Sequence, residues 1–177
     1  MIISMNLRWL PDFIDQKQLV RLEPIRYNFQ PTSHDSLAQA PGSYTLFIDE
    51  SGRFWKGLGE EEISGVRAVQ KREIASSITD NHIIASRPVS IALQTLRGKS
   101  LAAGRYHLKL YSTDSRLDQI SMQIWESERL IFNQKLESAR SDLVLKFSTG
   151  GGPLRLTMDA ASSEMNLAGL EIIPINE

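Results

Sequence analysis

The residues best suited to chemistry are aromatic and polar side chains at alternate positions in two neighbouring stretches. His107, Lys109 and Tyr111 occupy every second position of the first stretch, and Gln123 and Trp125 do so in the second. Successive side chains point to opposite sides of a strand, so each set predicts one polar and aromatic face. Sugar rings stack on Trp and Tyr while polar groups bind their hydroxyls. The pattern therefore favours carbohydrate binding.

Both stretches carry apolar residues at the intervening positions, which predicts strands with one buried face. Between them, residues 112–118 are polar and turn-forming with no apolar run, which is typical of a hairpin connection. If the apolar faces of such a hairpin coincide, its polar and aromatic side chains lie together on the other face. The sequence thus predicts one binding patch on a half-buried sheet.

A second candidate set is Tyr44, Arg53, Phe54 and Trp55, which lie close to several glycines. These residues offer another stacking surface with a basic neighbour. Glycines beside aromatic residues also mark turns whose rings pack under the loop, so a buried anchor remains the alternative for Trp55. Burial beneath another loop is likewise the alternative for Trp125.

Catalytic motifs are absent from the sequence. There is no cysteine, the three histidines lack the spacing of a zinc site, and no Gly-x-Ser-x-Gly block supplies a nucleophile. Carboxylates at 49–50, 60–62, Glu126 and Glu128 have the residue types of a glycosidase, but charge runs in turns are usually only solvated. We expect no enzyme activity and keep a glycan-active enzyme as the minority hypothesis.

Composition sets the remaining bounds. A chain of 177 residues with 41% hydrophobic and 23% charged residues fits one ordinary globular domain. Twenty basic residues against 21 acidic ones give a net charge of −1, which argues against nucleic acid as the main partner. The apolar run at the N-terminus is too short to span a membrane and has no convincing signal-peptide pattern. We therefore expect no nucleic-acid or membrane partner.

Short alternating runs separated by turn residues predict about nine or ten strands, typical of an antiparallel sandwich or barrel. We expect residues 25–177 to form this domain. Residues 1–24 are predicted to be a lead-in that is partly helical or belongs to a preceding domain, and a short helix fits residues 68–76. The predicted core comprises Phe29, Tyr106, Leu108, Leu110, Met122, Ile124, Leu145, Phe147, Leu156 and Leu170.

Several motifs resemble, in their order, the galactose-binding-like and malectin-like jelly-roll domains. They are Tyr27-Asn-Phe-Gln30, Pro41-Gly-Ser-Tyr44, Phe54-Trp-Lys-Gly-Leu-Gly59, the strand with Gly104, Tyr106, Leu108, Leu110 and Asp114, and Asn166 with Leu170-Glu-Ile172. More specifically, the sequence is similar to the N-terminal sandwich of GDS-type pectin-active carbohydrate esterases, over about residues 25–175. Gln30 departs from the family's glycine, and the long connection at 60–87 does not follow the pattern closely.

The resemblance implies an all-β, two-layer antiparallel jelly-roll β-sandwich. It also implies that Glu171 matches a glutamate facing a structural calcium in several relatives, with no other cofactor. We expect a non-catalytic carbohydrate-binding module that recognises a plant or bacterial polysaccharide and is associated with a glycan-degrading enzyme domain. The alternative is a structural or protein-interaction β-sandwich without a sugar site. The resemblance favours an extracellular or periplasmic location.

Overall fold

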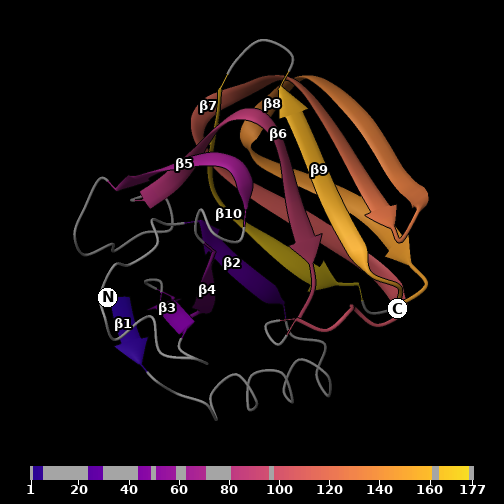
Figure 1. Cartoon of the computed structure of the whole chain (residues 1–177), viewed down its shortest axis with the longest axis horizontal. Coiled ribbons are helices and arrows are strands. Elements are labelled where there is room, and N and C mark those ends of the chain that lie inside the picture. Colours follow the sequence, from indigo (N-terminus) through magenta and orange to yellow (C-terminus); the bar gives the residue numbers. More distant parts are fainter. Residues whose placement is uncertain are drawn as a thin grey trace.

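The computed structural model of the chain describes residues 2–5, 24–29, 44–48, 51–58, 63–70, 81–95, 98–160 and 164–175. Every regular element within these ranges is a β-strand, as the alternating apolar patterns predicted (Figure 1). The strands are β1 (Ile2–Met5), β2 (Ile25–Phe29), β3 (Tyr44–Ile48), β4 (Phe54–Leu58), β5 (Ser64–Gln70), β6 (Asn81–Leu93), β7 (Gly104–Glu126), β8 (Arg129–Thr149), β9 (Leu154–Ala160) and β10 (Met165–Pro174). The described ranges contain no helix of the length and apolar composition needed to cross a bilayer.

The strands form two layers that share three long strands (Figure 1). In one layer, β10 pairs with β2, with the start of β6 and with the first half of β7. In the other, β9 pairs with the end of β6 and the second half of β7. β8 follows β7 along both halves. Because β6, β7 and β8 bend from one layer into the other, the fold is the two-layer jelly-roll sandwich that was predicted.

β4, β3 and β1 extend the first layer beyond β2, in that order, and β5 pairs with β6. The β2–β4 pairing is parallel, whereas the prediction was a purely antiparallel sandwich. β4 replaces the glycine-rich turn expected around Trp55. Its residues pair with β2 on one side and β3 on the other, so partners distant in sequence override the local turn signal.

Two other regions depart from the expected elements. β5 pairs with β6, so residues 68–70 are strand rather than the start of a helix; residues 71–76 lie outside the described residues. β1 joins the sheet through β3, whereas residues 6–23 of the predicted lead-in are not among the described residues. The boundary near residue 24 stays a prediction.

The predicted hairpin turn at residues 112–118 is wrong, because β7 continues through it. The register with β8 shifts between Tyr111 and Arg116, where β7 leaves β10 and approaches β9. Ser112 is buried in this stretch, and its hydroxyl donates to the carbonyl of Asn166 at 2.7 Å. The polar stretch marks a strand that changes layers, and β8 is continuous beside it.

The actual hairpin turn joins β7 to β8 at Ser127 and Glu128. Glu126 and Arg129 are directly paired, and Ser127 has a φ of 52°. A two-residue connection of this kind needs positive φ to match the twist of the strands. The amide of Ser127 also donates to the carbonyl of Pro153 at 2.8 Å, which ties this turn to the glycine-rich turn before β9.

The side chain of Glu126 makes further hydrogen bonds between these two turns. Its Oε1 accepts hydrogen bonds from the Thr149 hydroxyl at 2.6 Å and from the amides of Gly150 at 2.6 Å and Gly152 at 3.1 Å. The Arg129 guanidinium donates to Oε2 at 2.5 Å. The hydrogen bond from Thr149, followed by that from Arg129, lowers the pKa of Glu126 to about 2. Both oxygens of this carboxylate are therefore engaged in structural hydrogen bonds.

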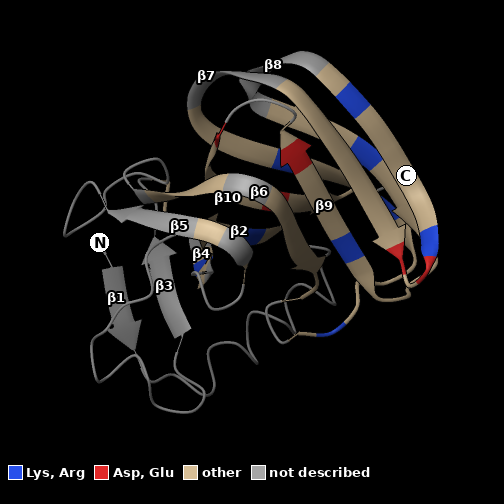
Figure 2. Ribbon diagram, turned by 45° about the horizontal axis from the view of Figure 1, so that its top comes forward, with Lys and Arg blue, Asp and Glu red and all other residues tan. Residues whose placement is uncertain are grey.

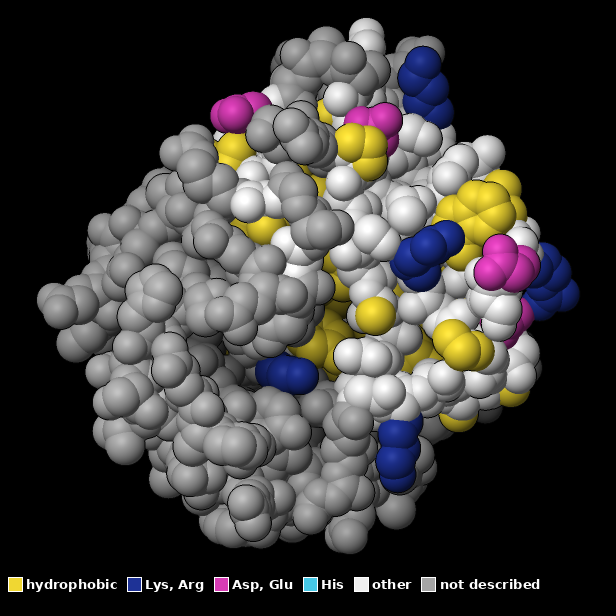
Figure 3. All heavy atoms as spheres, viewed as in Figure 1, with side chains coloured by type: hydrophobic (Ala, Val, Ile, Leu, Met, Phe, Trp, Pro, Cys, Tyr) yellow, Lys and Arg dark blue, Asp and Glu magenta, His cyan; other side chains and the backbone are white. Residues whose placement is uncertain are grey.

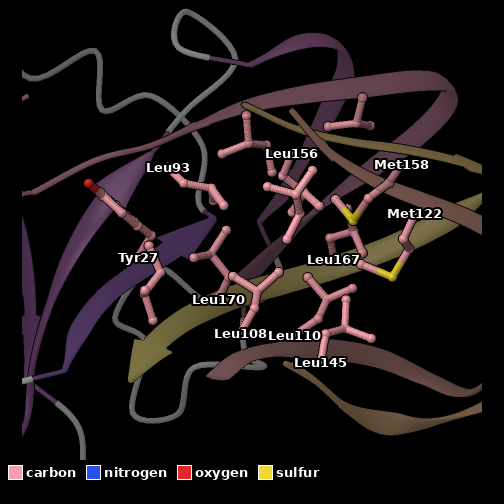
Figure 4. Close-up of a cluster of buried hydrophobic side chains, with 14 of the residues drawn as sticks. Tyr27, Leu93, Leu108, Leu110, Met122, Leu145, Leu156, Met158, Leu167 and Leu170 are labelled. Atoms are coloured by element: carbon pink, nitrogen blue, oxygen red, sulfur yellow. The ribbon is translucent and has the colours of Figure 1, made fainter. Parts of the chain in front are cut away.

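The core lies between the two layers and contains all ten residues predicted for it. Figure 4 shows leucine and methionine side chains from β6, β7, β8, β9 and β10 pointing toward one another, with Tyr27 at one end. The Tyr27 hydroxyl donates to the carbonyl of Gln94 at 2.7 Å, so its polar end is satisfied. Burying each such apolar side chain contributes about 1.5–3 kcal/mol, which holds the layers together.

Candidate functional site

The alternation along β7 gives the sandwich two different polar outer faces. Leu108, Leu110, Met122 and Ile124 all belong to one buried core, so the residues between them point outward from it. The first half of β7 lies beside β10 and the second half beside β9, in opposite layers. The prediction of a single patch is therefore wrong. His107, Lys109 and Tyr111 lie on one face and Gln123 and Trp125 on the other.

The Trp125 face is the outer surface of β6, β9, β7 and β8. Trp125 is partly exposed and stands in register with Arg155 on β9 and Leu130 on β8. The next row across the four strands consists of the uncharged polar residues Ser90, Thr157, Gln123 and Asn133. A third row holds Asp159, Ser121 and Lys135. All these residues are exposed or partly exposed, so the face is open to solvent.

This face has the chemistry of a shallow polar platform. Four strands at about 4.8 Å spacing give it a width of about 14 Å. Trp125 offers an aromatic surface, and the row beside it offers hydroxyl and amide groups that both donate and accept hydrogen bonds. Figure 2 shows basic and acidic residues interspersed along β8 and β9, and Figure 3 shows charged side chains scattered among uncharged ones on one side of the molecule.

The Glu171 face lies on the opposite layer and comprises Arg26, Trp55, Lys109, Tyr111 and Glu171. Glu171 on β10 stands in register between Arg26 on β2 and Lys109 on β7. It is 5% exposed, and its Oε1 accepts a hydrogen bond from Arg26 Nε at 2.6 Å. The Tyr111 hydroxyl donates to Oε2 at 3.1 Å. Both carboxylate oxygens thus have a donor from within the protein.

Aromatic rings close this cluster. The Trp55 and Tyr111 rings meet edge to face, with centroids 5.6 Å apart at an angle of 77°. The Arg53 guanidinium lies 5.7 Å from the centroid of Trp55, and Lys109 Nζ lies 4.8 Å from that of Tyr111. The structure therefore joins Arg53 and Trp55 to Lys109 and Tyr111, which the sequence had assigned to two separate sites.

Trp55 is fully buried, so the alternative of a buried anchor is correct for this residue. A sugar has no access to its ring in this structure. Arg53 is exposed, and its position over Trp55 is a cation–π contact. The side chains of Tyr44 and Phe54 lie outside the described residues.

The environment of Tyr111 keeps its phenol neutral. Burial, followed by the negative charge of Glu171 and the hydrogen bond to it, raises the pKa of Tyr111 to about 12; Arg53 and Arg26 oppose this rise. Tyr111 therefore remains a hydrogen-bond donor to Glu171 at neutral pH. The polar groups of this face satisfy one another and form a structural cluster.

The metal site predicted at Glu171 lacks support from these contacts. Calcium takes six to eight oxygen ligands, and a guanidinium 2.6 Å from one carboxylate oxygen repels a cation at that place. Within the described ranges, no group of three or more His, Asp or Glu side chains is arranged to hold a metal. A structural calcium stays a prediction.

Sequence reasoning missed the neighbours of Trp125. Alternation along residues 154–158 predicts that Arg155 and Thr157 point outward, but not that β9 lies beside the second half of β7. Ser90 and Asn133 come from two further strands, and no local signal links them. His107 lies on the same face as Lys109 and Tyr111 but outside the Glu171 cluster, in a pocket lined also by Arg105 and Lys146.

No protein-family model matches the chain, and no curated protein matches it. The ectodomain of ANX2 from Arabidopsis thaliana shares its fold with a TM-score of 0.51 and 12% identity, over 88% of this chain and 43% of that one. The ANXUR1 extracellular domain from the same plant gives a TM-score of 0.52 and 11% identity, over 88% of this chain and 42% of that one. A family 35 carbohydrate binding module from Clostridium thermocellum gives 0.41 and 9%, over 64% of this chain and 91% of the module.

At such identities these matches describe the fold alone. The chain spans about two fifths of the plant ectodomains that it matches. The matches to the plant ectodomains confirm the predicted sandwich as a similarity of fold, and membership of the galactose-binding-like or malectin-like domains stays a prediction. The narrower likeness to the sandwiches of GDS-type esterases is not shown by these matches.

Proposed function

We propose that this chain is a non-catalytic carbohydrate-binding module whose ligand lies on the Trp125 face. The observation that carries the proposal is the register that places a partly exposed Trp125 next to the row formed by Ser90, Thr157, Gln123 and Asn133. A sugar ring stacks on the indole through its C–H groups, while its hydroxyls exchange hydrogen bonds with the adjacent row.

The shape and charge of the face favour a neutral stretch of polysaccharide over a small ligand. The surface is a sheet face rather than a deep pocket, and the row beside Trp125 has no charge. Few polar contacts converge on such a shallow site, so we expect dissociation constants on the order of micromolar to millimolar. Arg155 and Lys135 lie at the margins, where they add hydrogen bonds to hydroxyl oxygens.

Affinity electrophoresis and glycan-array screening of the whole chain test this proposal. Trp125→Ala is expected to abolish retention by whichever polysaccharide slows the parent, and Trp125→Phe to retain part of it because a ring remains. Tyr111→Phe, on the opposite layer, serves as the matched control and is expected to bind like the parent. Unchanged binding by folded Trp125→Ala, or no retention of the parent by any polysaccharide, would reject the proposal.

An accessory role beside a glycan-degrading enzyme is a further part of the proposal, and its support is the sequence resemblance alone. The experiment is genomic and biochemical. We expect the gene to lie beside, or in frame with, a carbohydrate esterase or lyase, and fusion of the chain to that enzyme to increase its activity on insoluble polysaccharide. Equal activity with and without the chain would contradict the accessory role.

A further inference from the structure

A second surface feature lies away from the Trp125 face, on the layer that contains β10. An open pocket of about 290 Å³ is lined by Arg105, His107, Lys146, Phe147, Ser148 and Ile175. His107 and Lys146 are direct partners across β7 and β8, and Arg105 and Ser148 form the next outward pair. The amide of Ile175 donates to the carbonyl of Arg105 at 2.9 Å, which fixes the end of β10 against the pocket.

The lining is basic in a chain whose net charge is −1. Two cationic side chains and an imidazole come from adjacent strands, and none of the described residues that line the pocket is acidic. Diagonal neighbours on one face of a sheet are close enough for long side chains to interact, so Arg105 and Lys146 are able to reach one bound group together. Lys146 is exposed and has no ion pair with any residue in the described ranges.

His107 adds a hydrogen-bonding group that the fold leaves unsatisfied. Its Nε2 is buried and has no hydrogen-bond partner. In the tautomer with hydrogen on Nε2, or in the protonated ring, this nitrogen is a donor without an acceptor. A buried donor without an acceptor costs free energy. Because Nε2 is not exposed, the imidazole ring has to turn toward the pocket for an oxygen atom there to accept this hydrogen bond.

We propose that this pocket binds an oxyanion, of the carboxylate or sulfate type, between Arg105 and Lys146 with His107 as an additional donor. Such a group accepts charge-assisted hydrogen bonds from both cations. The volume suits one such group on a single sugar or a free ion rather than a polymer segment. The site is separate from the Trp125 face and does not depend on the carbohydrate-binding proposal.

The test is a titration of the ¹⁵N-labelled chain, followed by amide chemical shifts at constant ionic strength with sodium chloride as the balancing salt. The two probes are sodium sulfate and sodium glucuronate, which separate a free ion from an acidic sugar. We expect saturable shifts at the amides of residues 105–107 and 146–148, with a millimolar dissociation constant. Binding of both probes identifies the shared oxyanion chemistry, and binding of glucuronate alone identifies an acidic sugar.

Lys146→Gln is expected to weaken binding about 10-fold, the loss of one charge-assisted hydrogen bond. Arg105→Gln is expected to do the same. Lys135→Gln removes the same charge from an exposed position of β8 on the other layer and is expected to leave the affinity unchanged. Trp125→Ala is also expected to keep oxyanion binding, which distinguishes failure of this site from failure of the sugar-binding proposal.

Two results would overturn the assignment. One is the absence of saturable shifts with either probe up to about 50 mM, far above the affinity expected of this pocket. The other is equal weakening by Lys146→Gln and Lys135→Gln, which would mean that the anion responds only to net charge. Amide spectra of the variants without anion verify that each remains folded.

Discussion

β7 contributes residues to both the Glu171 face and the Trp125 face, but the polar side chains of the two faces differ in burial and in hydrogen-bond partners. On the Glu171 face, the carboxylate is 5% exposed and both of its oxygens accept hydrogen bonds from Arg26 and Tyr111. On the Trp125 face, the polar residues stand in rows that remain open to solvent. A buried polar group needs an internal partner, whereas an exposed one is free to exchange water for a ligand.

Trp55 and Trp125 differ in burial in the same way as the two faces on which they lie. Trp55 is fully buried and packs on Tyr111, so its ring contributes to the stability of the fold. Trp125 is partly exposed, with Arg155 and Leu130 as register neighbours. Residue type alone therefore does not identify a binding residue in this chain; exposure decides which tryptophan is able to meet a sugar.

The largest expected effect is a difference in the free energy of unfolding between variants of Trp55 and Trp125. Trp55→Ala is expected to lower the free energy of unfolding by about 3–5 kcal/mol, because it empties a filled buried site. Trp125→Ala is expected to cost about 1 kcal/mol, close to the average for point mutations. Urea denaturation followed by circular dichroism measures both. Similar losses for the two variants would show that Trp125 is also a core residue.

The next effect separates the carboxylates of the two faces. Glu171→Ala leaves Arg26 partly buried without its partner, and we expect a loss of about 3 kcal/mol in the free energy of unfolding. Asp159→Ala removes an exposed carboxylate from the Trp125 face and is expected to change stability by less than about 0.5 kcal/mol. The same denaturation experiment decides, and a small loss for Glu171→Ala would mean that the ion pair is not a structural element.

Acid is expected to weaken the hydrogen bonds that Glu126 accepts at the end of β7, next to Trp125. The pKa of Glu126 is lowered to about 2, so the unfolded state binds more protons below the ordinary pKa of 4.5. Its contribution to stability is therefore complete above pH 4.5 and is lost as the pH falls through about 2. Melting temperatures between these values should fall less steeply for Glu126→Gln than for the parent. Glu128→Gln, in the adjacent turn, should follow the parent.

Titration of the Tyr111 phenol tests whether it interacts with Glu171 in solution. The phenol pKa of Tyr111, about 12, should fall part of the way toward 10 in Glu171→Gln, because burial remains while the negative charge is lost. The sign of the linkage is that Tyr111 contributes stability below pH 10, which is lost as the pH rises through about 12. NMR with ¹³C-labelled tyrosine measures the shift. An unchanged pKa would indicate that Glu171 does not interact with the phenol in solution.

The smallest expected effect concerns calcium. Because Glu171 is engaged by Arg26 and Tyr111, we expect the same melting temperature with millimolar calcium and with a chelator. A rise with calcium that disappears in Glu171→Gln would restore the metal site implied by the resemblance. It would also require Arg26 to leave the carboxylate.

The local pattern of the sequence was sufficient for the strand class and for the core. Alternation along residues 106–110, 120–124 and 154–158 identifies the buried side of each strand, because the pleat allows only two directions for side chains. All ten predicted core residues are buried for this reason. The jelly-roll expectation came from the order of motifs, and the fold matches it.

Neighbours across the sheet could not be derived in the same way. The Arg26–Glu171 pair joins residues 145 positions apart, and Trp55 meets Tyr111 only because β4, β2, β10 and β7 lie in that order. Local composition also suggested a turn at residues 112–118, where β7 in fact bends into the other layer. A strand continues where partners supply hydrogen bonds, and β8 pairs with β7 on both sides of the bend, at Tyr111 and from Arg116 onward.

The sequence by itself determined which side of each strand is apolar and which residue types are available for binding, since both follow from period-two geometry and side-chain chemistry. The tertiary structure decided which of those residues share a face. The bend of β7 separates Lys109 and Tyr111 from Gln123 and Trp125, and it assigns the first pair to a closed cluster and the second to an open one. That division depends on pairing between distant strands, which no local pattern encodes.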